Sequence, residues 1–305
     1  MRILIAGGSG FLGSHLSTTL AAAGHTISIL TRQPSPVPSR STRLIPWTPT
    51  GSSTPWASTV GPVDAVINLA GASIADGRWS AARKAALVSS RLDATRALVH
   101  FIRQASPAPA VFISASAVGY YGNRGDDELT EADLPGDDFL AQLCTDWEAA
   151  ALDAKSPATR VVRIRTGLVL DADAGALPRM LLPFRMGLGG PLGSGRQFMS
   201  WIHRDDWVGL ISWILGNDSV DGALNATAPN PVTNADFGRT LGRVLRRPAI
   251  MPAPAFVLNL ALGEMAEALL LFSQRVRPAR ALAGGYRFAR PTLDAALADL
   301  LKPRN

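Results

Sequence analysis

The stretch GGSGFLGSHL, residues 7–16, decides the fold, because it satisfies two glycine spacings at once. These spacings are Gly7-x-x-Gly10-x-x-Gly13 and Gly8-x-Gly10-x-x-Gly13. The apolar run RILIA (2–6) precedes it, and a helical pattern over 11–23 follows. Glycine is needed where a turn takes positive φ and where backbone approaches a pyrophosphate, and the next helix offers free N–H groups to phosphates. The stretch therefore predicts a dinucleotide-binding turn between a first strand and a first helix.

Working outward from this turn, short β-branched runs alternate with helical patterns, which is typical of parallel βαβ units. The candidate strands cover 2–6, 26–30, 43–47, 64–70, 110–116, 160–165 and 222–228, and the helical patterns cover 11–23, 79–105 and 137–153. The segment 33–62 is rich in Pro, Ser and Thr and is predicted to be a loop with little helix. The pattern predicts an α/β fold with a Rossmann-type, doubly wound parallel sheet.

The character of the chain changes after Arg165. Residues 175–197 are dense in glycine and proline, and from about residue 233 the pattern becomes strongly helical. We therefore expect a dinucleotide-binding domain over 1–166 and a smaller, mainly helical substrate-binding domain over 167–305. The strand at 222–228 is expected to return to the sheet of the first domain.

Composition excludes several classes of protein. A chain of 305 residues that is 47% hydrophobic and 18% charged can bury a large core. The net charge is +6, but the 30 basic residues are scattered, and only Lys84, Lys155 and Lys302 among them are lysine. Without a basic cluster, the charge predicts no nucleic-acid partner.

The single cysteine, Cys144, excludes an intrachain disulfide or a multi-thiolate metal site, and it fits a reducing compartment. The N-terminal apolar run is too short for a signal peptide. The longest apolar segment, 256–272, contains Asn259, Glu264 and Glu267, which favours a buried helix over a membrane span. We expect a soluble cytoplasmic protein, a monomer or homodimer, with no metal, no membrane partner and a small-molecule substrate.

The end of the second strand distinguishes between cofactors. An acidic residue there would bond the ribose 2′-hydroxyl of NAD, whereas an arginine accommodates the 2′-phosphate of NADP. The sequence ILTRQ places Thr31 and Arg32 at this point, with no carboxylate. NADP (NADPH) is therefore the predicted cofactor. NLAG (68–71) and ISASA (113–117) follow at the ends of later strands, where open parallel sheets bind ligands.

In this order and spacing, the glycine turn, NLAG and the serine-bearing fifth strand resemble the extended short-chain dehydrogenase/reductase superfamily. Later motifs narrow the resemblance to its atypical "epimerase family protein" branch, which has a C-terminal domain of unknown function. The motifs are WEAAA (147–151), RTGLVL (165–170), LLPFRMGLGGPLGSGRQFMSWIHRDD (181–206), LNATAPNPVTNADFGRTLGRVLRRP (224–248) and LGEMAEALL (262–270). The resemblance covers nearly the whole chain.

The resemblance implies a set of cofactor contacts and an active-site serine. Ser116 matches the serine that bonds the reacting oxygen of the substrate. The implied cofactor contacts, with the serines of the turn and the fifth strand added, are Gly7, Ser9, Gly10, Phe11, Leu12, Thr31, Arg32, Leu69, Ala70, Gly71, Arg91, Ser114 and Val169.

One position departs from this pattern. Active relatives carry a helical tyrosine and, four residues later, a lysine that lowers the pKa of the tyrosine. By register, Cys144 and Glu148 stand at these two positions. A carboxylate disfavours a second negative charge nearby, so this pair cannot perform the usual proton transfer. We predict that Cys144 is a small buried residue rather than an acid or nucleophile. For Glu148, two roles remain open: a structural hydrogen-bond or ion-pair partner, and a functional group.

The three tyrosines are followed four residues later by Arg124, Gly125 and Arg290, so no tyrosine–lysine pair exists elsewhere. Tyr120 or Tyr121, a few residues past Ser116, could supply a phenol instead. Two hypotheses remain open: an NADP-dependent oxidoreductase or epimerase of modified mechanism, and an NADP-binding redox-sensing or regulatory protein without turnover.

Two further features have alternative interpretations. His203 could be a general acid or base near the cleft, although beside Asp205 and Asp206 a structural role is favoured. The segment GSGRQ (193–197) could bind an acidic or phosphate-bearing substrate through Arg196, or it could be a glycine-rich lid.

Overall fold

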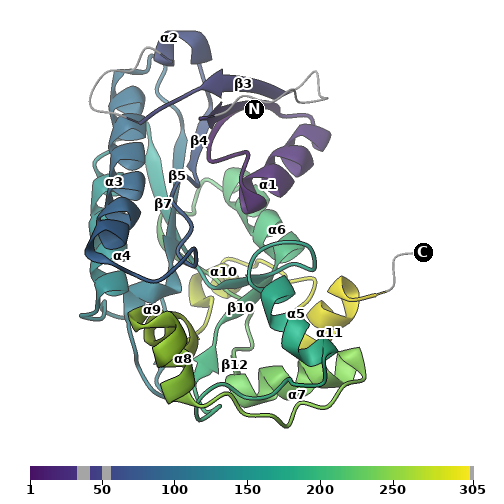
Figure 1. Cartoon of the computed structure of the whole chain (residues 1–305). Helices are drawn as coiled ribbons and strands as arrows, with labels where there is room; N and C mark the ends of the chain where they lie inside the picture. The colour runs from purple at the N-terminus through teal and green to yellow at the C-terminus, as the bar shows by residue number, and fades with distance from the viewer. Residues whose placement is uncertain (33–41, 50–55, 303–305) are drawn as a thin grey trace.

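A parallel sheet of seven strands forms the centre of the molecule (Figure 1). The computed structural model describes residues 1–32, 42–49 and 56–302. The strand order is β11-β7-β5-β4-β1-β2-β3, and every neighbouring pair is parallel. The strands are β1 (Arg2–Ala6), β2 (Thr26–Thr31), β3 (Thr42–Pro46), β4 (Ala65–Asn68), β5 (Val111–Ala117), β7 (Arg160–Thr166) and β11 (Gly222–Ala226).

Helices cover both faces of this sheet. Figure 1 shows α1 (Phe11–Ala22) and α6 (Arg204–Leu215) on one side, and α3 (Ala81–Gln104) and α4 (Phe139–Leu152) on the other. On β1, Ile3 and Ile5 belong to the core beneath α1 and α6, while Leu4 belongs to the opposite core. Strands buried on both faces need apolar residues without alternation, which explains the continuous run RILIA.

The predicted α/β architecture is confirmed, and most elements lie within two residues of their predicted bounds. The strand predicted at 222–228 does return to the sheet, as β11, and pairs with β7 at its edge. In the segment predicted to be a loop, α2 (Ala57–Val60) is a helix of four residues. The rest of that prediction at 33–41 and 50–55 lies outside the described residues.

The C-terminal part contains short strands and the remaining helices. Its core lies where α5, α7 and α11 meet and includes Phe184, Phe237, Leu241, Leu293 and Leu297. The remaining elements are η1 (Val118–Tyr121), β6 (Glu128–Leu129), β8 (Leu168–Leu170), α5 (Leu177–Arg185), β9 (Phe198–Met199), β10 (Trp201–His203), β12 (Val232–Thr233), α7 (Asn234–Leu245), α8 (Ala255–Leu262), α9 (Glu264–Ala266), η2 (Glu267–Leu271), β13 (Arg275–Val276), α10 (Ala279–Ala283) and α11 (Leu293–Leu300).

Strand register brings the predicted site segments to one edge of the sheet. Ala6 of β1 is level with Asn68 of β4, and Asn68 is level with Ser114 of β5. The loops that follow these three strands therefore leave the sheet side by side, at the edge where parallel sheets bind ligands.

Among the described helices, none combines the length and the apolar character that a bilayer crossing requires.

Candidate active site

The glycine turn between β1 and α1 leaves no room for side chains. Gly7 has a φ of 76°, and a Cβ on it would lie 2.7 Å from the carbonyl carbon of Leu69. The Gly10 N–H donates to the Gly7 carbonyl at 3.0 Å, which closes the turn. The turn from β1 and the loop after β4 are therefore in contact, as the sequence predicted for two parts of one cofactor site.

The N-terminus of α1 is open toward a ligand. Its N-cap residue is Gly10, which has no side chain to accept from the first N–H groups, and the first turn carries no acidic residue. Phe11 and Leu12 begin the helix. A helix N-terminus without such caps offers unpaired N–H donors and a partial positive charge, which suits a pyrophosphate.

The end of β2 lies beside this turn. The Ser9 hydroxyl is 3.3 Å from the hydroxyl of Thr31, which is buried. Arg32 follows and is exposed, and it forms no ion pair with any acidic residue in the described part of the chain. Ser9 and Thr31 are thus brought together, and the exposed Arg32 follows at the end of β2, where the sequence predicts the contact to a 2′-phosphate.

The loop after β4 is held by a residue that the sequence did not single out. Asn68 is fully buried, its Nδ2 donates to Thr95 at 2.9 Å, and its Oδ1 accepts from the Ala70 N–H at 3.1 Å. The Trp147 indole N–H donates to the same threonine hydroxyl at 2.9 Å. A buried amide must satisfy its polar atoms, and Asn68 does so by shaping the loop that carries Leu69, Ala70 and Gly71.

Arg91 lies directly under this loop. A Cβ on Gly71 would stand 3.2 Å from the Arg91 Cζ, and the guanidinium donates to the Ala72 carbonyl at 3.1 Å. Burial lowers the pKa of Arg91. No ion pair to a described carboxylate neutralises it, so the cofactor edge of the sheet carries a second cation. Val169 lies on β8 and is buried.

Ser116 sits in a buried ionic network beneath the strand ends. Its Oγ donates to Glu148 Oε1 at 2.8 Å. Arg165, level with Ser116 on the adjacent strand β7, donates through Nε and Nη2 to the two Glu148 oxygens at 2.8 and 3.0 Å. Arg163 adds a fourth bond at 3.2 Å. All four bonds end on one carboxylate, so Glu148 is a fully engaged ion-pair partner.

The two tyrosines after Ser116 have different surroundings. Tyr121 is fully buried, and its hydroxyl donates to Asn225 Oδ1 at 2.7 Å and accepts from Arg165 Nη1 at 3.0 Å. Burial raises the pKa of Tyr121 to about 12. Tyr120 is half-buried, and its ring centroid lies 3.4 Å from Arg165 Cζ. Both lie in the short turn η1, so Tyr120 and Arg124 do not share a helical face.

Cys144 and Glu148 lie one turn apart on α4, as the register predicted. Cys144 is 3% exposed, and burial raises the pKa of its thiol to about 11, with a further contribution from Glu148. At neutral pH the thiol is therefore protonated and shielded. The prediction of a small buried residue at this position is confirmed.

Comparison with known proteins places this architecture in a family. Residues 3–226 match the NAD dependent epimerase/dehydratase family, and residues 253–300 match a domain of unknown function, DUF1731. This chain belongs to the NAD dependent epimerase/dehydratase family.

Several relatives match this chain along nearly its whole length. Epimerase family protein SDR39U1 of Homo sapiens is 39% identical over 304 residues, covering 99% of this chain and 100% of the relative. Epimerase family protein MT2273 of Mycobacterium tuberculosis is 43% identical over 296 residues, covering 97% of this chain and 96% of the relative.

Solved structures agree with this placement. The crystal structure of human epimerase family protein SDR39U1 (isoform2) with NADPH has a TM-score of 0.91 and 37% identity, and each chain is covered to 100%. The Thermus thermophilus UDP-glucose 4-epimerase complex with NAD has a TM-score of 0.76 at 16% identity, which shows a common fold alone.

In this epimerase-family chain, the charges around Ser116 are the functional feature that sequence reasoning missed. Arg163 and Arg165 alternate along β7, a strand whose other residues are mostly buried and apolar. Two arginines two residues apart in a strand point to the same face and require a buried acid. That signal was present in RVVRIR, but the identity of the acid depends on where α4 packs.

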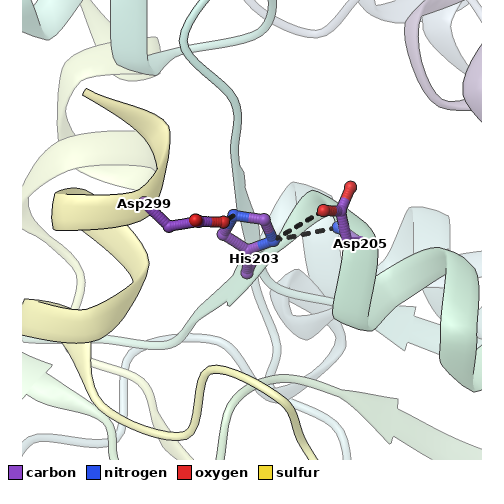
Figure 2. Close-up of side chains that lie close together, drawn as sticks. All are labelled: His203, Asp205 and Asp299. Carbon is purple, nitrogen blue, oxygen red and sulfur yellow. Dashed lines mark hydrogen bonds and ion pairs between the residues drawn. The ribbon is translucent and has the colours of Figure 1, made fainter. Parts of the chain in front are cut away.

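His203 lies beside two aspartates, Asp205 and Asp299 (Figure 2). It is 1% exposed, and its Nδ1 accepts from the Asp205 N–H at 3.0 Å, which caps α6. Its Nε2 lies 3.5 Å from Asp299 of α11. Burial lowers the pKa of His203. This geometry supports the structural role that the sequence favoured.

One ligand atom from each of His203, Asp205 and Asp299 lies within 4.8 Å of the others, beside a cavity of about 170 Å³. Since Nδ1 accepts a hydrogen bond, the neutral ring carries its proton on Nε2, which leaves no lone pair for a metal there. Arg290 also pairs with Asp299 at 2.8 Å and Asp205 at 3.6 Å. The group therefore joins α6 to α11 through His203 and Arg290.

The glycine-rich segment 193–197 is anchored on one side. Gln197 is buried, and its Nε2 donates to the carbonyls of Leu192 and Leu270 at 3.0 Å each. Arg196 beside it is exposed. Gln197 therefore ties the loop to η2, and no ion pair holds the Arg196 side chain among the described residues.

Proposed function

We propose that this chain binds NADPH and acts as an NADP-dependent oxidoreductase or epimerase on a small metabolite that carries a hydroxyl or carbonyl group. The observation that carries the proposal is the exposed Arg32 at the end of β2, which has no ion pair among the described residues and lies beside the uncapped N-terminus of α1. The human relative of 37% identity, crystallised with NADPH, supports the same cofactor. When bound, the nicotinamide supplies a carbon that donates or accepts hydride.

Different residues of this chain would contact different parts of the cofactor. Gly7, Ser9, Gly10, Phe11 and Leu12 would hold the pyrophosphate. Thr31 and Arg32 would hold the 2′-phosphate, and Leu69, Ala70 and Gly71 the adjacent ribose. Arg91, Ser114 and Val169 would complete the contacts around the nicotinamide half. Two cations without acidic partners, Arg32 and Arg91, suit a ligand with several phosphate charges.

Ser116 would hold the reacting oxygen of the substrate. An ionised carboxylate only accepts hydrogen bonds, so Ser116 donates its proton to Glu148, and its oxygen can accept a hydrogen bond in turn. A substrate hydroxyl could donate to these lone pairs while its carbon faces the nicotinamide. Arg165 and Glu148 act as positioning residues, because they fix the direction of the serine hydroxyl.

Tyr120 is the candidate proton donor or acceptor, because its ring is half-buried and not enclosed like that of Tyr121. Tyr121 would instead position Arg165, whose guanidinium it contacts. Residues 167–305 would supply the substrate-binding part, in a reducing compartment such as the cytoplasm. The chain would act as a monomer or a homodimer.

The cofactor proposal is tested by calorimetry on Arg32→Ala. A hydrogen bond to a charged group contributes about 1.5–3 kcal/mol, so NADPH affinity should fall about tenfold to a hundredfold. Affinity for NADH, which lacks the 2′-phosphate, should not change. Arg196→Ala, an exposed arginine outside the cofactor turn, is the matched control. Equal NADPH affinity in Arg32→Ala and the unmodified chain would overturn the assignment.

The reaction proposal needs a separate experiment. The protein is mixed with NADPH and a panel of carbonyl compounds, and with NADP⁺ and the matching alcohols, while absorbance of the reduced cofactor is followed. Ser116→Ala should abolish any turnover found, with NADPH binding retained. Turnover that is unchanged in Ser116→Ala contradicts the role of the serine.

A second candidate function is a redox-sensing or regulatory protein that binds NADPH without turnover. The observation that favours it is the pair Cys144 and Glu148 at the dyad register, where the thiol has a pKa of about 11. Such a protein should change its partner interaction or assembly when NADPH replaces NADP⁺. Steady turnover of any metabolite in the panel above would remove the need for this candidate.

A further inference from the structure

The loop that follows β4 reaches across to the C-terminal part of the chain. Its tip, residues 75–78, is joined to α5 by one side chain. Arg179 Nη1 donates to the Ala75 carbonyl at 3.2 Å, and Arg179 Nη2 lies 3.5 Å from Asp76 Oδ1. In the described part of the chain, no other side chain bonds to this tip. We call these two bonds of Arg179 the α5 latch.

The segment before α5 lies against the helix of the cofactor turn. Gly175 has a φ of 75°, and a Cβ on it would lie 3.0 Å from Cε1 of Phe11, the first residue of α1. The segment is fixed at both ends. Asp171 is fully buried and pairs with Arg204 of α6, and Leu177 is fully buried in the core of the C-terminal part. The second half of the chain therefore supplies a fixed wall beside the N-terminus of α1.

These contacts form a closed circuit that begins and ends on the glycine turn. At one end of the turn, Gly7 touches Leu69, and the chain continues from Leu69 to the tip. The latch then crosses to Arg179, and the chain leads back to Gly175, which touches Phe11 at the other end of the turn. The pyrophosphate of the cofactor is proposed to bind on this turn, so the tip is placed to close over it.

The latch is a weak contact that solvent reaches. The side chains of Arg179 and Asp76 are 68% and 58% exposed. An exposed ion pair stabilises little, because water and salt screen it and both side chains lose freedom in forming it. At the end of the tip, the Arg78 guanidinium lies near Gly263 without a hydrogen bond or ion pair among the described residues. The tip can therefore leave α5 at a small cost in free energy.

The rest of the loop is held in place, so motion is confined to the tip. The Ser73 carbonyl accepts from Arg83 Nη2, and the Ile74 carbonyl accepts from the Trp79 indole N–H at 3.0 Å. Within the tip, Gly77 has a φ of 85°, and a Cβ on it would meet no atom within 4 Å. Glycine tolerates large changes of φ and ψ, and small residues often serve as hinges of closing loops.

We infer that the tip 75–78 is a gate over the cofactor site, which the α5 latch holds shut and which opens to admit and release NADPH. The inference rests on the proposed function, because it requires the cofactor to bind at the glycine turn. It gives Arg179 and Asp76 a role in the rate of cofactor exchange rather than in its affinity. Loop closure of this kind sequesters a bound ligand from water and can limit its release.

The test is the rate of NADPH exchange by the full-length chain, measured by stopped-flow fluorescence. Association is followed on mixing with NADPH, and dissociation is followed by displacing bound NADPH with excess NADP⁺, which does not fluoresce. Arg179→Ala removes the latch, so both rate constants should rise about threefold to tenfold. The dissociation constant should change less than about twofold, because an open gate speeds entry and exit alike.

Two further variants make the test specific to the latch. Arg179→Asp combined with Asp76→Arg reverses the ion pair, and this double variant should exchange NADPH more slowly than Arg179→Asp alone. Arg239→Ala is the matched control, because Arg239 is 69% exposed and pairs with Asp236 on α7. The control should exchange NADPH at the wild-type rates.

The possible failures can be told apart. Equal exchange rates in Arg179→Ala and the wild type overturn the gate and leave the cofactor proposal intact. Faster dissociation with unchanged association would make Arg179 a direct cofactor contact and would also overturn the gate. A wild-type chain that binds no NADPH overturns the proposed function and the gate with it.

Discussion

At the scale of single residues, the buried charges beside Ser116 form one network. Glu148 of α4 pairs with Arg165 of β7. Burial alone would lower the pKa of Arg165, but its bonds to Glu148 raise it above its ordinary value. Both members of the pair are therefore charged, and each depends on the other for compensation.

The first prediction concerns this pair. Glu148→Ala leaves two arginines and a serine without their acceptor, so the free energy of unfolding should fall by about 3–5 kcal/mol. Urea denaturation measures this loss. Glu264→Ala is the control, because the side chains of Glu264 and its partner Lys84 are 48% and 29% exposed, and removing a pair that solvent reaches costs about 0–1 kcal/mol. Similar losses of unfolding free energy in the two variants would show that the buried network stabilises the fold no more than the Lys84–Glu264 pair does.

At the scale of elements, the β1–α1 turn depends on close backbone contact. A Cβ on Gly13 would overlap the Gly7 carbonyl oxygen and lie 2.6 Å from the Gly8 Cα. The helix must therefore begin against the strand, and this contact aims its N-terminus at the cofactor site.

Gly13→Ala is the prediction at this turn. Replacing a helical glycine by alanine usually stabilises a helix by up to about 1 kcal/mol, but here the overlap should reverse the sign and displace the turn. Loss of detectable NADPH binding in calorimetry is the expected result. Gly216→Ala, where the nearest atom to a new Cβ is 3.7 Å away, is the control and should bind normally. Normal binding by Gly13→Ala would contradict the role of the close contact.

The cap of α6 leads to a prediction about acid stability. Burial is the main cause that lowers the pKa of His203, and Arg290 adds to it, while Asp205, Asp206 and Asp299 act in the opposite direction. The unfolded chain therefore takes up this proton first as the pH falls, and the folded state loses stability below about pH 6.5, down to the lowered pKa. Protonation would also place a hydrogen on Nδ1 and break the bond from the Asp205 N–H.

The variant His203→Asn should separate the capping of α6 by residue 203 from the effect of histidine protonation on stability. Asparagine is a good N-cap residue, so stability at neutral pH should remain close to wild type, whereas His203→Ala should lose about 1 kcal/mol. Urea denaturation at several pH values between about 5 and 7.5 should show a smaller loss on acidification in the asparagine variant than in wild type. An identical pH dependence in both proteins would exclude His203 as its source.

At the scale of the whole molecule, both halves of the chain contribute strands to the sheet and helices that cover it. Trp207, Ile211 and Ile214 of α6 pack in the same core as Ile3 of β1 and Ile164 of β7. The edge strand β11 also comes from beyond residue 166. The predicted boundary at residue 166 therefore separates segments that share a core.

A truncated chain tests this dependence. A fragment of residues 1–166 lacks α6 and β11, so the face of its sheet that α1 and α6 cover together is left with α1 alone. We expect it to bind a hydrophobic dye and to show no cooperative thermal transition, in contrast to the full chain. A cooperative transition of the fragment at the temperature of the full chain would establish 1–166 as an independent domain.

Much of the fold and the cofactor side of the site could be predicted because their signals are local. The glycine spacing, the apolar runs of the strands and Arg32 after β2 each occupy a few neighbouring residues, and backbone sterics or hydrophobic periodicity acts within that length. The prediction that Cys144 and Glu148 stand at the positions of a tyrosine and a lysine rests likewise on register within one helix.

What only the tertiary structure decided depends on which elements become neighbours. Glu148 meets Arg163 and Arg165 because α4 packs against β7, and His203 meets Asp299 because α11 lies beside β10. The exposure of Phe256 and Leu260, in a segment whose sequence predicts burial, is likewise set by what packs nearby. Local sequence determines which shapes a segment can take, but the partners of charged and apolar side chains are chosen by long-range packing, where desolvation makes each unmatched group costly.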